Sequence, residues 1–486
     1  MNTSGITLLG LGPGDPGLVT RQAWDLLESV TEIYLRTDQH PVVAHFPAGL
    51  KVHTFDHLYE QGDSFKSVYT QIVEQVLEIG KTEKGVVYAV PGHPFVAEAT
   101  GPEIARRARQ LGVPLRLVEG LSFLEPVLSA LGVDPFPQTT LMDALELADL
   151  HVPPFSPSTP AIIAQIHSKV VANEVKLTLM SIYPDDYPVE LVHAAGTGEQ
   201  IVERLLLYEI DRSPRIGLLT ALYVPPLPPS TSFEAFQEVI AHLRAPNGCP
   251  WDRKQTHQTL RSHLLEEAYE VLTALDADDP NAMREEFGDL LLQIVLHAQI
   301  ASEYGEFTMQ DVLTSIHDKI VRRHPHVFGD LKVKDVDGVL HNWEKLKAAE
   351  RAENGKAEAS LLDSVALTLP ALVQALEYQD RAARVGFEWP EINGVYDKVA
   401  EEIAEVQAAD SEAARAAEVG DLLFAVVNLA RWLKVDPESS LRETNQRFRL
   451  RFGGIESAAR ARGKTVADLS PDEMEAVWQA FKQDNP

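Results

Sequence analysis

The pattern of apolar and polar residues changes character along the chain. Up to about residue 225, short apolar runs such as "GITLLGLG", "GVVYAVPGHP", "PLRLVEG" and "VKLTLMSIY" are separated by amphipathic stretches such as "GPEIARRARQLG". Short apolar runs next to Gly or Pro are typical of buried strands, and amphipathic stretches with a period near 3.6 residues are typical of helices. Their alternation predicts an α/β domain with a largely parallel sheet over residues 1–225.

Past Thr231 the strand signals nearly disappear. The segment "YVPPLPPSTS" holds four prolines and predicts a stiff linker, because proline cannot continue a helix. The rest of the chain consists of long amphipathic stretches divided by short polar turns, which predicts an all-α region. A second break, "RAENGKAEAS" at residues 351–360, divides this region into two halves, 231–350 and 360–486.

The two halves repeat one arrangement of acidic residues. "EEAYEV" in the first half and "EEIAEV" in the second are each followed by an acidic residue, a Gly-Asp pair and an apolar run, within "EEFGDLLLQIVLHA" and "AEVGDLLFAVVNLA". The acidic residues are Glu266, Glu267, Glu270, Glu286 and Asp289 in the first copy, and Glu401, Glu402, Glu405, Glu418 and Asp421 in the second. A single acidic helix face is usually only solvated, but a duplicate in register is much rarer.

Helical spacing places these carboxylates on facing helices. "EEIAEV" groups its glutamates within about 100° of one another, and Glu418 and Asp421, three residues apart, share a face of the next helix. The apolar run after Asp421 predicts a core helix, so antiparallel packing should bring the carboxylates together. Converging carboxylates repel one another unless a cation offsets their charge, and Mg²⁺ prefers oxygen ligands. The spacing predicts one metal site at Glu402, Glu405, Glu418 and Asp421, and a second candidate at Glu267, Glu270, Glu286 and Asp289.

Composition limits the partners and the compartment. The 486 residues include 43 Lys and Arg against 72 Asp and Glu, a net charge of −29. This excess repels nucleic acid phosphates and anionic membranes, which argues against both as partners. No apolar run approaches the roughly 18 residues of a membrane span, the start lacks the pattern of a signal peptide, and Cys249 is the only cysteine. We therefore expect a soluble, cytoplasmic protein.

Both halves resemble the MazG family of nucleoside triphosphate pyrophosphohydrolases, whose signature is EExxE followed by ExxD on paired helices. The segments "LRAPNGCPWDRKQTHQTLRSHLLEEAYEV", "RRHPHVFGD" and "LPALVQALEYQDRAARVGFEWP" carry the resemblance, which extends from about Phe233 to the C-terminus. It implies all-α helical bundles, assembly into a homo-oligomer such as a dimer, and conversion of nucleoside triphosphates (NTP or dNTP) to nucleoside monophosphate and pyrophosphate. It also implies Mg²⁺ as the cofactor, with Mn²⁺ as an alternative.

Basic and aromatic residues accompany the second copy. Lys398 lies one turn before Glu402, and four further residues form two pairs, each pair spaced four residues apart on one helix face. By resemblance, the substrate-binding residues are Lys398, Glu401, Arg447, Arg451, Trp478 and Lys482. The alternatives are that Trp478 is a core residue and that the arginines are surface ion-pair partners.

The first copy differs from the second in one cation. It has His263 where the second has Lys398, and its other counterparts are Lys319, Arg323, Trp343 and Lys347. Histidine is the weaker cation because it is partly neutral at pH 7. In two-repeat members of the MazG family the C-terminal copy is the hydrolytic one, and Lys398 favours the same assignment. We therefore expect the second copy to hold the main site and the first to be weaker or structural.

A glycine-rich turn follows the first predicted strand. In "GLGPGDPGLVT" the glycines allow a ligand to approach the backbone, although a structural turn is the default for such a sequence. With "YAVPGHPFVAEAT" and "VEGLSFLEPVLSALGVD", this turn resembles the tetrapyrrole (corrin/porphyrin) methylase family over nearly all of the first 225 residues. The resemblance implies two α/β lobes with S-adenosylmethionine between them. The candidate residues for such a ligand are Gly10, Gly12, Gly14, Gly92, His93, Pro94 and Ser122, with His93 in place of the aspartate of the family's GDP motif.

These features lead to three hypotheses about function. The first is a house-cleaning or regulatory NTP pyrophosphohydrolase that carries a methylase-like N-terminal domain. The second is an S-adenosylmethionine-dependent methyltransferase in which the helical repeats serve oligomerisation or regulation. The third is a binding or regulatory protein with vestigial metal sites. The complete set of carboxylates and cations in the second copy favours the hydrolase.

Overall fold

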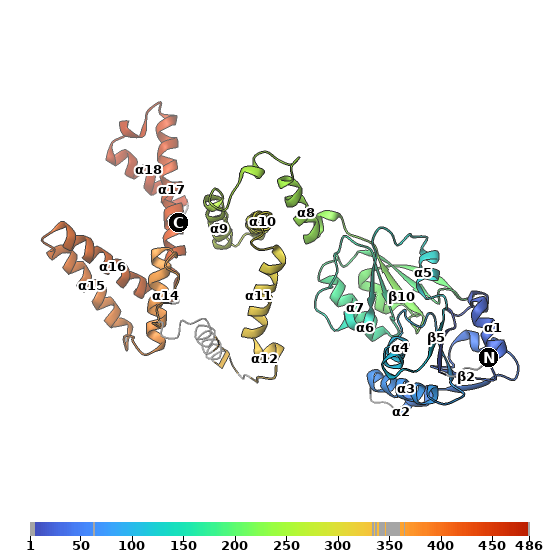
Figure 1. The fold of residues 1–486 in the computed structure, drawn as a ribbon. Helices are drawn as coiled ribbons and strands as arrows, with labels where there is room; N and C mark the ends of the chain where they lie inside the picture. Colours follow the sequence, from blue (N-terminus) through green and yellow to red (C-terminus); the bar gives the residue numbers. More distant parts are fainter. Residues whose placement is uncertain are drawn as a thin grey trace. The chain divides into compact units, whose positions relative to one another are not determined.

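A computed structural model describes residues 5–61, 64–332 and 365–484, together with 335, 338–339, 346 and 360–363. The chain divides into two compact units, Met1–His242 and Leu243–Pro486. Among the described residues, strands occur only in the first unit, and the second is helical (Figure 1). The predicted succession of an α/β region and an all-α region is confirmed.

The first unit begins with a lobe built on a five-stranded parallel sheet of order β3-β2-β4-β1-β5. Its elements are β1 Ile6–Gly10, α1 Arg21–Ser29, β2 Glu32–Leu35, β3 Lys51–Thr54, α2 Asp56–Gln61, α3 Phe65–Gly80, β4 Val86–Val90, α4 Thr100–Leu111 and β5 Leu115–Val118. Side chains alternate along each strand, so Tyr88 of β4 packs with α3 and α4 while Ala89 packs with α1. Helices therefore cover both faces of this sheet, as parallel sheets require.

The second lobe has a mixed sheet of order β6-β7-β10-β8-β9. Its elements are α5 Leu124–Leu131, β6 Thr140–Asp143, α6 Ala144–Ala148, β7 Ala161–Ala164, α7 Lys169–Met180, β8 Pro188–His193, β9 Ile201–Leu206 and β10 Thr220–Val224. Only β6 and β7 pair in parallel, and the remaining pairs are antiparallel. The prediction of a largely parallel sheet is correct for the first lobe and wrong for the second.

One predicted strand is a helix. The run "VKLTLMSIY" begins inside α7, which Ser168 caps by accepting a hydrogen bond from the Val171 amide. Val171, Val175 and Leu179 lie on the buried face of α7, at the four-residue spacing of a helix. The run by itself alternates apolar and polar residues every second position, as a strand does. The cap at Ser168 and the helical spacing of the buried residues that begin before the run make it part of a helix instead.

The second unit contains two sets of helices that begin with α8 Phe233–Arg244, a helix that crosses the unit boundary. The first set is α9 Arg261–Asp276, α10 Pro280–Glu303, α11 Met309–Arg323 and α12 Pro325–Phe328, and the second is α14 Ala371–Arg384, α15 Ile392–Ala408, α16 Glu412–Trp432, α17 Pro437–Ala461 and α18 Pro471–Asp484. Short 3₁₀ helices cover Pro16–Leu18, Pro41–His45, Leu207–Arg212, Pro229–Thr231, Asp252–Lys254 and Val466–Asp468. Within the described part of the chain, no helix has the length and apolar character to cross a membrane.

The same helical hairpin occurs in both sets. α9 packs on α10, and α15 packs on α16, across connections of three residues. Asp279 caps α10 by accepting from the amides of Asn281 and Ala282, and Ser411 caps α16 by accepting from Ala414. These caps satisfy amides that the first turn of a helix leaves without partners, so they fix where each second helix begins. The predicted break at 351–360 lies outside the described residues except for Ser360, as do Trp343 and Lys347.

Three turns of the first lobe, at Gly10, Gly92 and Gly120, pack directly against one another through their backbone atoms. An added Cβ on Gly10 would lie 2.5 Å from the amide nitrogen of Gly120 and 2.6 Å from the carbonyl oxygen of Gly92. Gly12 and Gly92 exchange two backbone hydrogen bonds, of 3.2 and 2.8 Å, and both have positive φ, at 75° and 68°. The turn after β1 is thereby locked to the turn after β4, and only glycine fits at Gly10.

The crossing predicts that Gly10→Ala destabilises the first unit. The new methyl group would meet backbone atoms that cannot rotate away, and overpacking of this kind costs about 1–3 kcal/mol. Differential scanning calorimetry of the full chain should show the transition of the first unit shifted down by several degrees, because about 1 kcal/mol corresponds to about 2–4 °C for a unit of this size. Gly198→Ala is the control, since an added Cβ there meets nothing within 4 Å. Equal melting temperatures for the two variants would contradict the assignment.

Candidate functional site

The hairpin α15–α16 brings together three of the predicted metal ligands. Glu402 and Glu405 on α15 and Glu418 on α16 each offer a carboxylate oxygen that lies within 4.8 Å of the other two. On another side, α16 is held by α14, where Nε2 of Gln379 donates to the carbonyl of Phe424 at 2.8 Å. α16 therefore positions Glu418 against the two glutamates of α15. The prediction that α16 is a core helix is only partly correct, because Leu423 and Val426 of its apolar run are exposed in the chain.

Glu402 is the buried member of this group, with only 4% of its surface exposed. Its Oε1 accepts from Nζ of Lys398 at 2.8 Å, and its Oε2 is buried with no hydrogen-bond partner among the described residues. A buried carboxylate with one satisfied oxygen is costly unless a further positive charge reaches it. The donor set and the unpartnered oxygen fit a hard divalent cation bound between the two helices.

Two charged groups near Glu402, the Glu405 carboxyl and the Lys398 ammonium, have shifted pKa values. Loss of contact with water raises the pKa of Glu405, and the negative charges of Glu402 and Glu418 raise it further. Hydrogen bonds to Glu402 and Glu401 raise the pKa of Lys398, so its ammonium group stays charged at neutral pH. The electrostatic potential at Glu402 is therefore set by several neighbouring carboxylates and by one positive charge, the Lys398 ammonium group.

The hairpin α9–α10 repeats the arrangement in the first copy. Oxygens of Glu267, Glu270 and Glu286 also lie within 4.8 Å of one another. Desolvation raises the pKa of Glu267, with further contributions from the charges of Asp289 and Glu270. In place of a lysine, Nδ1 of His263 lies 3.7 Å from Oε2 of Glu266. The first copy therefore keeps the three close glutamates, but it has a histidine beside Glu266 in place of the lysine that contacts the buried Glu402.

Two predicted residues of the second copy lie outside the group of three carboxylates. Glu401 is exposed and accepts from Nζ of Lys398 at 2.9 Å. Asp421 is exposed one turn after Glu418 and is not within the 4.8 Å group. In the first copy, Asp289 is likewise outside the group, although its charge acts on Glu267 and Glu286.

The predicted substrate-binding residues of α17 and α18 form a separate cluster. The guanidinium carbon of Arg451 lies 5.8 Å from the ring centre of Trp478, and the ring of Phe448 lies 5.3 Å from that of Trp478. Trp478 also packs against the small core that contains Ile455, so it is partly a packing residue, as the alternative interpretation holds. Arg447 donates to Glu443 and Thr444 within α17, and Lys482 is exposed near the end of α18.

The predicted ligand residues of the first unit are only partly gathered around one cavity. A cavity of about 1680 Å³ is lined by Gly12 and Gly92, whereas Gly10, Gly14, His93, Pro94 and Ser122 are not among its lining residues. Ser122 is buried, and its hydroxyl donates to Glu125 and accepts from the amide of Leu124. Nδ1 of His93 accepts from the amide of Phe95. These polar groups serve local turns.

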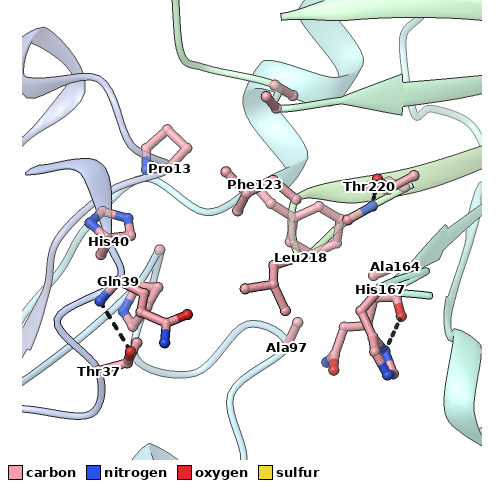
Figure 2. A pocket seen from close by; sticks show the side chains of 18 of the residues that line it. Pro13, Thr37, Gln39, His40, Ala97, Phe123, Ala164, His167, Leu218 and Thr220 are labelled. Carbon is pink, nitrogen blue, oxygen red and sulfur yellow. Dashed lines mark hydrogen bonds between the residues drawn. The ribbon is translucent and has the colours of Figure 1, made fainter. Parts of the chain in front are cut away.

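Other residues of this cavity escaped the sequence analysis. Figure 2 shows Thr37 and His40 on one wall and His167 and Thr220 on the other, with Leu218 between them. They come from both lobes, so no local motif joins them. The one available signal was that Arg36 and Thr37 directly follow β2, since ligands of parallel sheets bind beyond the carboxyl ends of the strands.

Comparisons with known proteins agree with both units. Residues 5–211 match the family model described as Tetrapyrrole (Corrin/Porphyrin) Methylases, and residues 255–328 match that of the MazG nucleotide pyrophosphohydrolase domain. The crystal structure of a cobalt precorrin-4 methyltransferase, CbiF, aligns with 46% of this chain and 95% of its own, at 18% identity and a TM-score of 0.36.

Curated relatives cover the chain in two ways. "Uncharacterized protein YabN" of Bacillus subtilis is 42% identical over 98% of both chains. The "Nucleoside triphosphate pyrophosphohydrolase/pyrophosphatase MazG" of Thermotoga maritima is 42% identical over 51% of this chain and 95% of its own length. The "Nucleoside triphosphate pyrophosphohydrolase" of Escherichia coli K12 is 45% identical over 50% of this chain and 95% of its own. The chain belongs to the MazG family.

Membership of the MazG family accounts for the repeated hairpin. The MazG model matches α9 to α12, the first repeat, and the relatives match about 250 residues, which is enough for both repeats. The resemblance read from the sequence is confirmed for the MazG repeats and for the methylase-like unit that precedes them. In this member the carboxylates of the second MazG repeat have the lysine partner, and those of the first have the histidine.

The shifted pKa of Glu405 predicts opposite effects of Glu405→Gln with and without metal. A carboxyl whose pKa is raised by folding favours the fold at low pH and loses that contribution as pH rises through the folded value. At pH 7 without metal, the variant should therefore melt at the same temperature as the wild type or higher, because one of three like charges is gone. With millimolar Mg²⁺ the wild type should gain more thermal stability than the variant.

Glu456→Gln is the matched control, since it removes an exposed glutamate of α17 outside the carboxylate group. It should respond to Mg²⁺ like the wild type. A Glu405→Gln chain that is less stable than wild type without metal, or that gains as much from Mg²⁺, would contradict the metal-site geometry.

Proposed function

We propose that this chain hydrolyses nucleoside triphosphates, NTP or dNTP, to nucleoside monophosphate and pyrophosphate, in a house-cleaning or regulatory role. The observation that carries the proposal is the group Glu402, Glu405 and Glu418, whose buried member keeps one oxygen without a partner. The names of the relatives that the second half of this chain covers almost completely point to the same reaction.

The proposed site is the second repeat, with Glu402, Glu405, Glu418 and Asp421 as the ligands of Mg²⁺, for which Mn²⁺ could substitute. When bound, such a cation neutralises triphosphate oxygens and polarises a water molecule. Lys398 contacts the buried Glu402, with Nζ 2.8 Å from Oε1, and so would hold that carboxylate in position. Glu405, the exposed member of the group, would complete the ligand set from the solvent side, where a substrate can reach it.

The remaining predicted residues are proposed to hold the substrate. Arg447, Arg451 and Lys482 supply cations for the phosphates, and Trp478 supplies a ring against which the nucleotide lies. Arg451 and Trp478 are already in contact, which favours a single subsite on α17 and α18. Glu401 supports Lys398 through its hydrogen bond. The first repeat would be a weaker or structural copy, because it has a histidine, His263, at the position where the second repeat has Lys398.

The helical repeats are also the proposed interface of a homo-oligomer, with a dimer as the simplest form. α16 exposes Val419, Leu423 and Val426, at the spacing of one helix face. α10 exposes an equivalent stripe, Phe287, Leu291 and Ile294, each 132 residues earlier. Apolar stripes beside the carboxylates in both repeats are more than a monomer usually leaves in water. A second copy of the same helices is their proposed occupant.

Methyl transfer is the second candidate function. The match of residues 5–211 to the methylase family and the cavity lined by Gly12 and Gly92 favour binding of S-adenosylmethionine by the first unit. If methyl transfer were the activity, loss of the carboxylates of α15 and α16 would leave it unchanged. A cytoplasmic location is proposed for either function, because a single cysteine cannot form a disulfide within the chain.

The hydrolase is tested by pyrophosphate release from a panel of NTPs and dNTPs with Mg²⁺. Glu402→Ala with Glu418→Ala should lower the rate at least about 100-fold, as expected when charge stabilisation at a reacting phosphate is lost. Glu267→Ala with Glu286→Ala removes the matching residues of the first repeat and should leave most of the activity. Loss of activity only in the second double variant would reverse the assignment of the copies. A wild-type chain that releases no pyrophosphate from any substrate would refute the hydrolase.

The interface predicts a change of oligomeric state. Leu423→Glu with Val426→Glu places two charges in the stripe of α16 and should shift the chain toward a monomer in analytical ultracentrifugation, because buried unpaired charges destabilise an interface. Leu367→Glu is the control, since Leu367 is exposed but lies on neither stripe. A wild-type monomer, or a double variant that assembles like the wild type, would exclude this face.

A further inference from the structure

The first MazG repeat contains two histidines that form a hydrogen bond with each other. His257 lies in the segment that leads to α9, and His297 lies on α10. Their Nδ1 atoms are 2.8 Å apart, whereas the ring centres are 5.1 Å apart and the ring planes differ by 8°. The rings therefore meet edge to edge through these nitrogens. One Nδ1 must carry a proton and the other must not, because a hydrogen bond needs one donor and one acceptor.

The histidine pair closes one end of the hairpin α9–α10. At the other end, the three-residue connection joins the two helices. His257 lies shortly before Arg261, the first residue of α9, and attaches this end to the later part of α10. Glu267 and Glu270 of α9 lie between the two attachments. The pair therefore helps to fix how the carboxylate-bearing part of α9 lies against α10.

A second attachment holds the same segment through charge. Arg244 donates to both carboxylate oxygens of Glu303 on α10, at 2.7 and 2.6 Å, and it also donates to the backbone carbonyls of Asp252 and Gln255. The hydrogen bonds from Arg244 lower the pKa of Glu303, so this carboxylate stays ionised at mildly acidic pH. The segment before α9 therefore has one attachment that persists as pH falls and one, the histidine pair, that can titrate.

A neighbouring carboxylate favours one arrangement of the protons. Oε2 of Glu306, in the turn after α10, lies 3.8 Å from Nε2 of His257 and favours a proton on that nitrogen. Nδ1 of His257 is then the acceptor, and Nδ1 of His297 is the donor. Titratable groups on the segment and on the helices around α10 are Asp252, His263, Glu266, Glu267, Glu270, Glu286, Asp289, Glu303 and Asp311. Of these, His263 lies beside Glu266, and Asp311 of α11 accepts from Thr308.

The remaining ring nitrogen, Nε2 of His297, is buried and has no hydrogen-bond partner in the part of the chain that the structure describes. One turn earlier on α10, Oε1 of Gln293 is likewise buried without a partner there, so no hydrogen bond joins the two groups. Burial lowers the pKa of His297, and the charge of His257 lowers it further. The ring of His297 is therefore mainly neutral at pH 7.

An added proton has no position that leaves the pair undisturbed. On Nδ1 of His257 it would set two N–H groups against each other and break the hydrogen bond. On Nε2 of His297 it would place a charged donor in a buried position without an acceptor, which is unfavourable. The closed pair therefore binds fewer protons than two histidines in water. Its contribution to stability is complete above the ordinary histidine pKa of about 6.5 and is lost as pH falls below that value.

The second repeat has a leucine where the first has His297. In the two apolar runs "LLLQIVLHA" and "LLFAVVNLA", Leu429 stands at the position of His297 and Ala425 at that of Gln293. α16 is attached to α14 by the hydrogen bond from Gln379 to the carbonyl of Phe424, and neither group titrates. The histidine contact is thus a property of the first repeat.

We propose that the His257–His297 pair is a proton-sensitive latch of the first repeat. At neutral pH the latch holds residues 249–260 and the start of α9 on α10. Below about pH 6, proton uptake opens the latch while Arg244 still holds the beginning of the segment. Glu267 and Glu270 then lose their fixed position against α10. The first repeat thus responds to pH through a contact that the second repeat lacks, and the latch does not depend on triphosphate hydrolysis.

The test is hydrogen–deuterium exchange of the full chain at pH 7.5 and pH 5.5, with rates corrected for the intrinsic pH dependence of amide exchange. The amides to follow are those of Arg253, Gln255 and Leu260, which donate to backbone carbonyls within the segment. Their protection should fall at least about fivefold at pH 5.5, because the open segment binds protons that the closed pair excludes. Equal protection at the two pH values would overturn the proposal.

The corresponding loop of the second repeat is the internal control. Residues 385–394 are held by Glu388, which accepts hydrogen bonds from Arg431 and Trp432 on α16. Peptides from this loop should keep their protection at pH 5.5. An equal loss in both loops would indicate general acid destabilisation and would also overturn the latch.

Two double variants separate titration from packing. His257→Leu with His297→Leu replaces the hydrogen bond with an apolar contact. His257→Gln with His297→Gln keeps donors and acceptors but has no group that titrates near neutral pH. In each, the fall in protection between pH 7.5 and pH 5.5 should shrink to less than about twofold. His317→Gln is the control, because His317 is an exposed histidine beside Asp318 on α11, and it should keep the wild-type fall.

A double variant that loses as much protection at pH 5.5 as the wild type would overturn the proposal, since other groups would then carry the pH effect. Loss of protection already at pH 7.5 in both double variants would support the pair as the attachment of the segment. In that case the response of the wild type to pH decides whether the attachment is a switch.

Discussion

The second repeat depends on holding three carboxylates within 4.8 Å of one another while one of them, Glu402, is almost fully buried. Mutual repulsion and loss of water both oppose this arrangement. The chain offsets it with a capped hairpin, with α14 anchoring α16 through Gln379, and with the ammonium group of Lys398 on one oxygen of Glu402. The other oxygen remains without a partner among the described residues, which supports the cation site proposed for this repeat.

The two repeats show how one scaffold can carry unequal sites. Each hairpin has the same three-residue connection, the same carboxylate spacing and the same exposed apolar stripe. The difference lies in the cation, because Lys398 reaches the buried glutamate whereas His263 lies near the exposed Glu266. A fixed positive charge on a buried ligand both lowers the cost of burial and orients the carboxylate. The two repeats therefore share the same helical packing, and they differ in the residue beside the glutamates, which is Lys398 in the second repeat and His263 in the first.

The first unit is organised by contacts between segments far apart in the chain. Gly10, Gly92 and Gly120 meet at backbone distance, and Arg36 and Glu98 form a buried pair across 62 residues. The glycines that look like a ligand loop in the sequence mainly allow this crossing.

The sequence by itself determined the two fold classes, the duplicated hairpin and the carboxylates that converge on it. These depend on periodicity and on spacings of three or four residues, which are local properties of a helix. Sequence reasoning failed for "VKLTLMSIY" and for the mixed sheet of the second lobe, since an apolar run suits a buried helix as well as a strand. Only the tertiary structure decided the cavity around Arg36 and His40, the burial of Glu402, and the position of Asp421 outside the close group of carboxylates. Each of these depends on which distant segments pack together, and no local spacing records that.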